Sequence, residues 1–195
     1  MIAFLRGEFV HKTPSQLNIE VNGVGYEVQI SLHTYGHIQA LKHGLLHIYF
    51  QVKEDGHTLF GFFDPIEKEM FVQLISISGV GASTARMMLS SMKPEEIAGA
   101  IAKGDSRQLE NIKGIGKKTA ERIVLELRDK IGKFHPDSNI SPLINNTLER
   151  DALNALIALG ISRQVAEQAV KKAMLVLKEP RAGVEEIIKQ ALKTL

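Results

Sequence analysis

A short pattern that occurs twice in the middle of the chain constrains the fold more than any other feature. Residues 74–86 and 109–122 each run from an apolar helical segment through a Gly-hydrophobic-Gly tripeptide into a second helix. The tripeptides are Gly79-Val80-Gly81 and Gly114-Ile115-Gly116. Glycine permits tight turns, so a repeated turn in matching helical contexts predicts a tandem helix-hairpin-helix.

These turns suit contact with phosphate. Without Cβ atoms, their backbone N–H groups can approach a phosphate closely, and a helix start adds the positive end of its dipole. Lys117, Lys118 and Arg122 follow the second tripeptide and can neutralise phosphates. The pattern therefore predicts binding to the DNA backbone without base-specific contacts.

Two other phosphate motifs fail when compared letter by letter. A P-loop needs an initial glycine where this chain has Asn111, and a Ser or Thr where it has Lys118. The third glycine of a dinucleotide fingerprint would fall at Thr84 or Thr119. The sequence shows no nucleotide cofactor site.

The first 64 residues alternate apolar and polar side chains with a period of two. This period predicts short, half-buried strands. Asn22-Gly23 and Asp55-Gly56 mark tight turns between strands. Five or six antiparallel strands of this kind predict an OB-like β-barrel.

The rest of the chain divides into three parts, and the fold class is α+β with several domains. Residues 65–131 form the tandem helix-hairpin-helix domain, and residues 132–147, which are rich in Pro, Asn and Ser, form a flexible linker. Residues 148–195 form a three-helix domain. Its expected apolar stripes are Leu148, Ala152, Leu156 and Leu159; Val165, Ala169, Ala173 and Leu177; and Val184, Ile187, Ile188, Ala191 and Leu195.

Composition restricts the function classes. The net charge of +2 is too small for DNA binding by charge alone, but positions 103–133 carry nine Lys and Arg residues. The chain has no cysteine, no signal peptide pattern and no apolar run of membrane-spanning length, so a cytoplasmic location is expected.

The sequence shows no recognised catalytic motif, and we assign no catalytic residue, metal ligand set or cofactor. His33 and His37 have the i, i+4 spacing of metal ligands only if they lie on a helix, and the segment 31–37 is not expected to be helical. Glu54 and Asp55 lie at a predicted hairpin tip. Taken alone, they are two acidic side chains on a surface turn and indicate no function.

Taken together, these landmarks resemble the RuvA family, whose members are Holliday junction branch migration complex subunits. The resemblance covers essentially the whole chain. It is carried by Met1–Gly7, Asn22–Tyr26, Leu59–Phe62 and the two glycine hairpins, the second of which continues through Lys117-Lys118-Thr119-Ala120-Glu121-Arg122. At the first hairpin the family often has Pro-Lys, where this chain has Ala82-Ser83.

The resemblance implies a non-catalytic scaffold that holds a Holliday junction open. The protein would be a homotetramer, with one or two tetramers on a junction. Its last domain would recruit the RuvB ATPase, and a RuvC resolvase is a further partner that the resemblance allows. Glu54 and Asp55 match an acidic pin that repels phosphates at the crossover. The DNA-contacting set would comprise Gly79, Val80, Gly81, Ser83, Arg86, Gly114, Ile115, Gly116, Lys117, Lys118 and Arg122, with Ser83 or Arg86 in place of the missing lysine.

Two alternatives stay open at the level of sequence. One is a helix-hairpin-helix lyase, glycosylase or nuclease that uses Lys117 or Lys118 with Asp129. The other is a generic DNA-binding accessory module whose last domain binds another partner. A preference for four-way junctions over duplex of equal length separates the RuvA-like scaffold from both.

Overall fold

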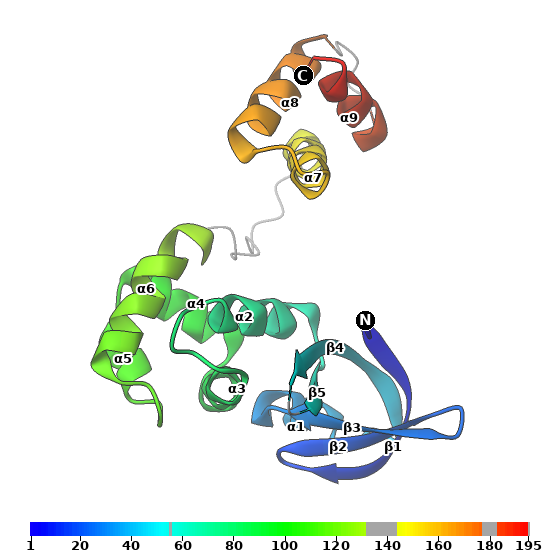
Figure 1. Cartoon of the computed structure of the whole chain (residues 1–195), viewed down its shortest axis with the longest axis vertical. Helices are drawn as coiled ribbons and strands as arrows, with labels where there is room; N and C mark the ends of the chain where they lie inside the picture. Colours follow the sequence, from blue (N-terminus) through cyan, green and yellow to red (C-terminus); the bar gives the residue numbers. More distant parts are fainter. Residues whose placement is uncertain (55, 132–143, 177–182, 195) are drawn as a thin grey trace. The chain divides into compact units, whose positions relative to one another are not determined.

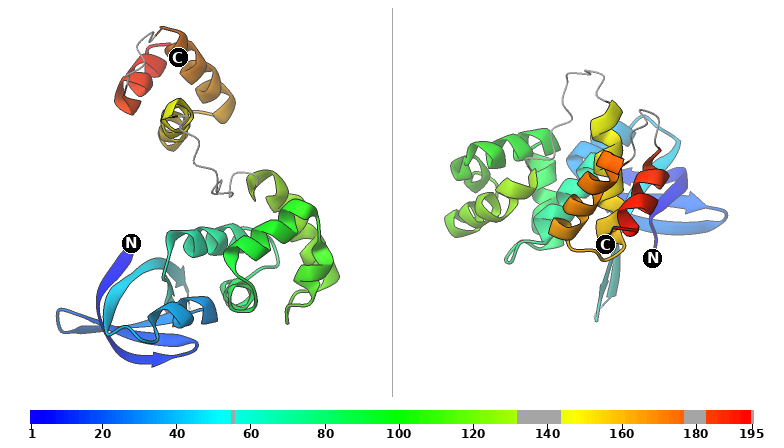
Figure 2. Two further views of the ribbon diagram at one scale, coloured as in Figure 1. Left: turned by 180° about the vertical axis from the view of Figure 1, so that it is seen from behind. Right: turned by 90° about the horizontal axis from the view of Figure 1, so that it is seen from above.

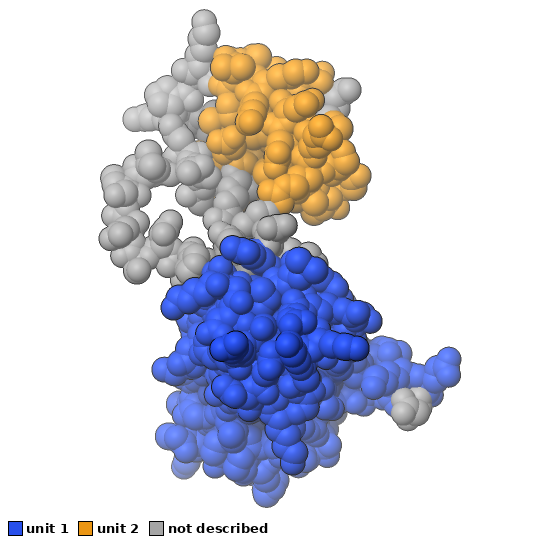
Figure 3. Space-filling model, turned by 90° about the vertical axis from the view of Figure 1, so that its left-hand side faces the viewer, with its two compact units in different colours: residues 1–136 blue, residues 137–195 orange. Residues whose placement is uncertain are grey.

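The structure, a computed structural model, describes residues 1–54, 56–131, 144–176 and 183–194. The chain divides into two compact units, residues 1–136 and 137–195 (Figure 3). Within the described residues, unit 1 contains a β-barrel and six helices, and unit 2 contains three helices (Figure 1). In the parts of the chain that are described, no helix is long and apolar enough to cross a membrane.

The first part of unit 1 is a closed five-stranded barrel, which confirms the OB-like prediction. Its strands are β1 (Phe4–Thr13), β2 (Gln16–Val21), β3 (Val24–Ile30), β4 (His43–Lys53) and β5 (Gly56–Phe62). They pair in the order β1-β2-β3-β5-β4, and β1 closes the barrel on β4. All pairs are antiparallel except β3 with β5, since helix α1 (Leu32–Ile38) intervenes between β3 and β4.

The alternation in the sequence gives the barrel its core. Leu17 and Ile19 of β2, with Val28 of β3, are fully buried, while their neighbours along each strand are exposed or half-buried. Between these strands, Asn22 and Gly23 have φ values of 52° and 83°. Positive φ at both positions is what a type I′ hairpin requires, which confirms the predicted turn.

The expectation that residues 31–37 are not helical is wrong. Ser31 caps α1 by accepting a hydrogen bond from the backbone N–H of Thr34 at 3.0 Å. Ser90, from a distant helix, accepts from the backbone N–H of Leu32 at 3.1 Å. Ile38 is fully buried in the barrel core. The helix is thus stabilised by caps and burial that its residue propensities do not reveal.

The helical part of unit 1 shares a hydrophobic core with the barrel. Its helices are α2 (Pro65–Ile75), α3 (Ala82–Ser91), α4 (Pro94–Lys103), α5 (Ser106–Glu110) and α6 (Lys117–Ile131). The ring of Phe71 on α2 packs against Phe60 and Phe62 of β5, with centroid separations of 5.2 and 4.9 Å. The barrel and the two hairpins are therefore packed into one unit.

Unit 2 is the expected three-helix domain, with α7 (Ile144–Ala158), α8 (Arg163–Val176) and α9 (Val184–Leu192). Helix α7 begins inside the segment predicted as a linker, of which residues 132–143 lie outside the described residues. Two stripe assignments are wrong: Leu159 follows the end of α7 and is 65% exposed, and Val165 is 45% exposed. Ala166 and Val170 take the buried positions on α8 instead, because the helix turns a neighbouring face to the core. Leu177 and Leu195 lie outside the described residues.

Candidate nucleic-acid interface

The first glycine hairpin connects α2 to α3. Gly79 has a φ of +93°, a conformation that side chains rarely adopt. The backbone N–H of Val80 donates to the carbonyl of Ile77 at 3.0 Å, and both side chains are buried. Gly81 then begins α3, where its carbonyl accepts from the N–H of Ala85. The apolar residues anchor the loop, while Gly79 and Gly81 remain exposed.

The second hairpin, between α5 and α6, repeats this geometry. Gly114 has a φ of +92°, Ile115 donates to the carbonyl of Ile112 at 3.0 Å, and Gly116 accepts from Ala120 at 2.9 Å. The internal repeat seen in the sequence is therefore a repeat of backbone conformation. Gly114 and Gly116 are exposed, as are their counterparts.

The backbone N–H groups at the start of α3 are available to an anion. Gly81 has no side chain to cap the helix, and neither α3 nor α6 has an acidic residue in its first turn. A Cβ atom built on Gly81 or Gly116 would meet nothing within 4 Å, so the space in front of each turn is open. Each hairpin can thus present main-chain donors to a phosphate.

Arg122 joins the two hairpins. It lies on α6, and its Nη1 donates to the carbonyl of Ser78 in the first hairpin at 3.1 Å. Its Nε lies 3.9 Å from a carboxylate oxygen of Glu126, and about half of the Arg122 side chain is exposed. The contact with Ser78 brings the hairpins side by side.

The basic side chains of the interface belong to the second hairpin. Lys117 and Lys118 begin α6 and are exposed, so their ammonium groups are accessible to a phosphate. The first hairpin is neutral, since residues 70–85 contain no charged side chain. Ser83 is exposed in the first turn of α3. Any electrostatic attraction is therefore concentrated on one of the two turns.

Arg86, the second candidate to replace the missing lysine, is hydrogen-bonded to the barrel. Its Nη1 donates to the carbonyl of Ser15 at 2.9 Å and to Oε1 of Gln29 at 2.6 Å, both in the barrel. Burial against the barrel lowers the pKa of the guanidinium. The side chain of Arg86 thus points from α3 into the junction with the barrel, and its predicted contact with DNA stays a prediction.

The acidic hairpin tip is the end of a long β-ribbon. Strands β4 and β5 stay paired as far as Lys53 opposite Gly56, and the ribbon extends away from the body of unit 1 (Figure 2, right). Glu54 is exposed at this tip. Asp55, its predicted partner, lies outside the described residues.

A buried polar cluster that the sequence did not reveal connects the barrel to α2. Glu67 of α2 is fully buried, and its two carboxylate oxygens accept from the hydroxyls of Ser31 and Thr34. Burial raises the pKa of Glu67, and the two hydroxyl hydrogen bonds oppose that shift. The only sequence signal was the spacing of Asp64 and Glu67, since Asp64 caps α2 by accepting from the N–H of Glu67 at 2.7 Å.

The same cluster brings possible metal ligands together. Atoms of His33, Asp64 and Glu67 lie within 4.8 Å of one another, and His33 Nε2 is 3.6 Å from Asp64 Oδ2. However, the Glu67 oxygens already accept hydroxyl hydrogen bonds and Asp64 caps α2. These contacts give the cluster a structural role, because they connect α2 to α1 and its N-terminal cap.

Three regions of the chain match known protein families. Residues 1–61 match the RuvA N terminal domain, residues 71–129 the SAM-like helix-hairpin-helix tandem, and residues 147–195 the RuvA C-terminal domain. Proteins named Holliday junction branch migration complex subunit RuvA are 47% identical in Christiangramia forsetii and in Flavobacterium psychrophilum, over 100% of both chains in each case. The chain belongs to the RuvA family. A relative of the same name in Geobacter sulfurreducens is 44% identical over 100% of this chain and 99% of its own.

The hairpins and the last three helices match separate families. The helix-hairpin-helix match spans both hairpins, including Gly79, Gly114 and the contact from Arg122 to Ser78. The C-terminal match covers unit 2 from residue 147.

Proposed function

We propose that this chain binds Holliday junctions as the non-catalytic scaffold of a branch migration complex. The observation that carries the proposal is the pair of hairpins with matched backbone geometry, joined by the contact from Arg122 to Ser78. Two adjacent turns can hold the backbone of one duplex arm at two phosphates. The names of the RuvA relatives support a four-way junction as the DNA that is bound.

The proposed DNA-contacting surface follows the predicted set, without Arg86. Main-chain groups of the turns bind phosphates, Lys117 and Lys118 neutralise them, and Ser83 contributes a hydroxyl at the neutral hairpin. The full set is Gly79, Val80, Gly81, Ser83, Gly114, Ile115, Gly116, Lys117, Lys118 and Arg122.

The β4–β5 ribbon acts as an acidic pin in this proposal. Glu54 carries negative charge at the end of the hairpin, which extends from the rest of unit 1 (Figure 3), and Asp55 adds a second carboxylate next to it in the sequence. Placed at a crossover, these carboxylates repel the phosphates of strands that approach one another. The pin keeps the strands apart and is not a catalytic group.

Assembly and partners complete the proposal. Four copies arranged around the junction give one hairpin pair to each arm, and a second tetramer can cover the opposite face. Unit 2 docks the RuvB ATPase, which supplies the motor, and a RuvC resolvase acts on the same junction. Leu159 and Leu175, which are 65% and 78% exposed, offer unit 2 apolar surface for such docking.

A gel-shift titration tests the function. A synthetic four-way junction is compared with a linear duplex of the same arm sequence, at two salt concentrations and with excess competitor DNA. We expect discrete junction complexes at protein concentrations that leave the duplex free. Equal binding to both DNAs would reduce the protein to a generic helix-hairpin-helix module, and cleavage without partners would favour the lyase or nuclease alternative.

A further inference from the structure

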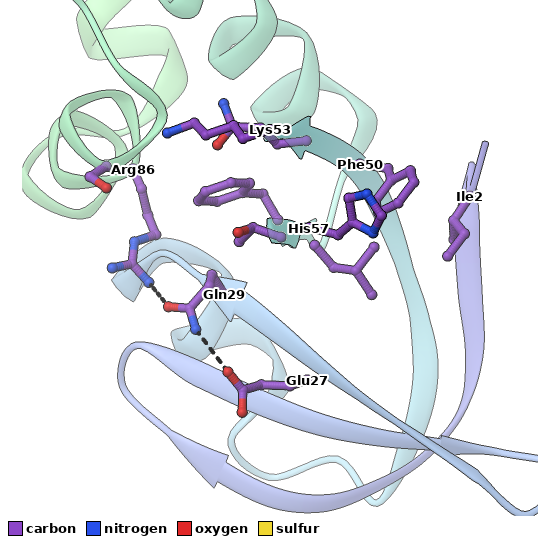
Figure 4. Close-up of a pocket in the computed structure, with 12 residues that line it drawn as sticks. Ile2, Glu27, Gln29, Phe50, Lys53, His57 and Arg86 are labelled. Atoms are coloured by element: carbon purple, nitrogen blue, oxygen red, sulfur yellow. Dashed lines mark hydrogen bonds between the residues drawn. The ribbon is translucent and has the colours of Figure 1, made fainter. Parts of the chain in front are cut away.

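A polar groove lies between the first hairpin and the pin. It has a volume of about 500 Å³ and is lined by α3, β3, β4 and β5. Arg86 lies at one end, and Phe50 and His57 lie towards Ile2 at the other (Figure 4). Ser83 of the first hairpin lines its edge, while the glycine turns and Glu54 are not among its lining residues.

The strand register creates the groove. Strand β3 pairs with β5 only from Val28 opposite Leu59 to Ile30 opposite Gly61. The β4–β5 ladder continues past this point, as far as Lys53 opposite Gly56. Within the described strands, the edge of β5 from 56 to 58 therefore has β4 on one side and the groove on the other.

The groove holds positive charge in a fixed place. Arg86 uses a single nitrogen, Nη1, for its bonds to Ser15 and Gln29, so its charge is positioned without using all five guanidinium donors. Lys53 also lines the groove, next to Glu54 of the pin. Among the described residues of the lining, Glu27 is the one acidic residue, 3.5 Å from the amide nitrogen of Gln29. Within that part of the lining, Lys53 and Arg86 outweigh one carboxylate.

The other end of the groove is aromatic. The rings of Phe50 and His57 have centroids 5.4 Å apart with an interplanar angle of 65°. Phe50 is half-buried and His57 is exposed. Proteins recognise single-stranded nucleic acid with aromatic rings held next to positive charge. Any base can stack on such a ring while its phosphate is neutralised.

We propose that this groove binds a nucleotide of single-stranded DNA, with the phosphate at Lys53 and Arg86 and the base against Phe50 and His57. The inference rests on the proposed function, since a crossover held open by the pin provides the unpaired strand. The groove receives a strand that the pin has separated from its partner. The hairpins, in contrast, hold duplex arms.

Binding of a fluorescein-labelled oligomer of ten thymidines, measured by fluorescence anisotropy, tests the site. We expect Lys53→Gln to weaken binding several-fold, and to reduce the slope of log K against log salt by about 0.7, the value for one lost single-strand phosphate contact. Lys42→Gln is the matched control, since it removes an exposed lysine just before the opposite end of β4. Phe50→Leu, which keeps an apolar side chain on the strand, should weaken binding about fivefold or more.

Further outcomes separate this site from the proposed function. If Lys53→Gln and Lys42→Gln bind the oligomer equally, the groove is not the site, even where junction gel shifts are normal. If 4-thiothymidine at a crossover cross-links to peptides outside the groove, the proposal is also overturned. If Lys53→Gln changed the mass of the protein assembly but still bound the thymidine oligonucleotide normally, the groove would instead be a contact between copies of the protein. If the unaltered protein did not bind four-way junctions, the proposed function itself would be refuted.

Discussion

Arg122 donates a hydrogen bond to the main-chain carbonyl of Ser78 at 3.1 Å, across 44 positions of sequence. The bond connects the helix that follows one hairpin to the loop of the other. It makes the hairpins a single surface, whose spacing is set inside the protein before any DNA arrives.

Removing this bond should loosen the first hairpin. For Arg122→Ala we expect junction affinity to fall about tenfold, since a charge-assisted hydrogen bond is lost together with a phosphate contact. Hydrogen exchange should rise in residues 76–81. Glu126→Gln, which removes only the exposed pair with Arg122, is the control and should have little effect. Unchanged exchange in the first hairpin would show that the bond does not hold the loop.

Gly79 and Gly81 should differ when each is replaced by alanine. Gly79→Ala forces a side chain into positive φ and should cost about 1–2 kcal/mol of stability. Gly81 has a φ of −82° and open space around it, so Gly81→Ala should unfold like the unaltered protein. Its Cβ should nevertheless hinder approach of a phosphate and weaken junction binding. Thermal unfolding and gel shifts measure the two effects; normal junction binding by Gly81→Ala would exclude backbone contact at this turn.

The lysine pair should act through charge alone. In the double variant Lys117→Gln, Lys118→Gln, the slope of log K against log salt should fall by up to about 1.8 for duplex arms. All arm sequences should be affected alike, since phosphates carry no sequence information. Lys42→Gln, which removes an exposed lysine just before β4, is the comparison and should leave this slope unchanged. A loss confined to particular arm sequences would contradict the role of the lysines.

Neutralising the pin should change the crossover but not the assembly. In the double variant Glu54→Gln, Asp55→Asn, we expect lower fluorescence from 2-aminopurine at the crossover, because the strands are no longer repelled and stack again. The oligomeric mass should stay the same. Glu69→Gln, on the exposed surface of α2, is the control. Equal 2-aminopurine signals from the pin variant and the control would show that the carboxylates do not separate strands.

Glu67 should make the stability of unit 1 depend on pH. Its folded pKa is raised above the ordinary value of 4.5, so it stabilises the fold fully below that value and progressively less as pH rises through the folded pKa. Glu67→Gln removes this titration. The unaltered protein should therefore lose stability relative to Glu67→Gln from pH 4.5 upward.

Urea unfolding at several pH values measures this difference. Tyrosine emission reports on the barrel, because the chain has no tryptophan. Tyr26 and Tyr49 lie on barrel strands, and Tyr35 lies on α1 and packs against the barrel core. A free-energy difference between the two proteins that does not vary with pH would show that Glu67 titrates normally. A difference that grows in favour of the unaltered protein would reverse the sign of the shift.

The sequence alone determined the elements whose signals are local. The period of two placed the barrel strands, Asn22-Gly23 specified a turn with positive φ, and the repeated tripeptides specified Gly79 and Gly114. Backbone conformation and the alternation of buried faces depend on neighbouring residues, so they can be read along the chain.

Only the tertiary structure decided the partners of the long polar side chains. Arg86 points into the barrel, Arg122 reaches the other hairpin, and Glu67 is buried against Ser31. Helix α1 likewise depends on Ser90 and on the barrel core rather than on its own residues. Each of these contacts joins residues dozens of positions apart through a directional hydrogen bond. Such bonds form only when packing brings donor and acceptor within about 3 Å, a condition that no local pattern encodes.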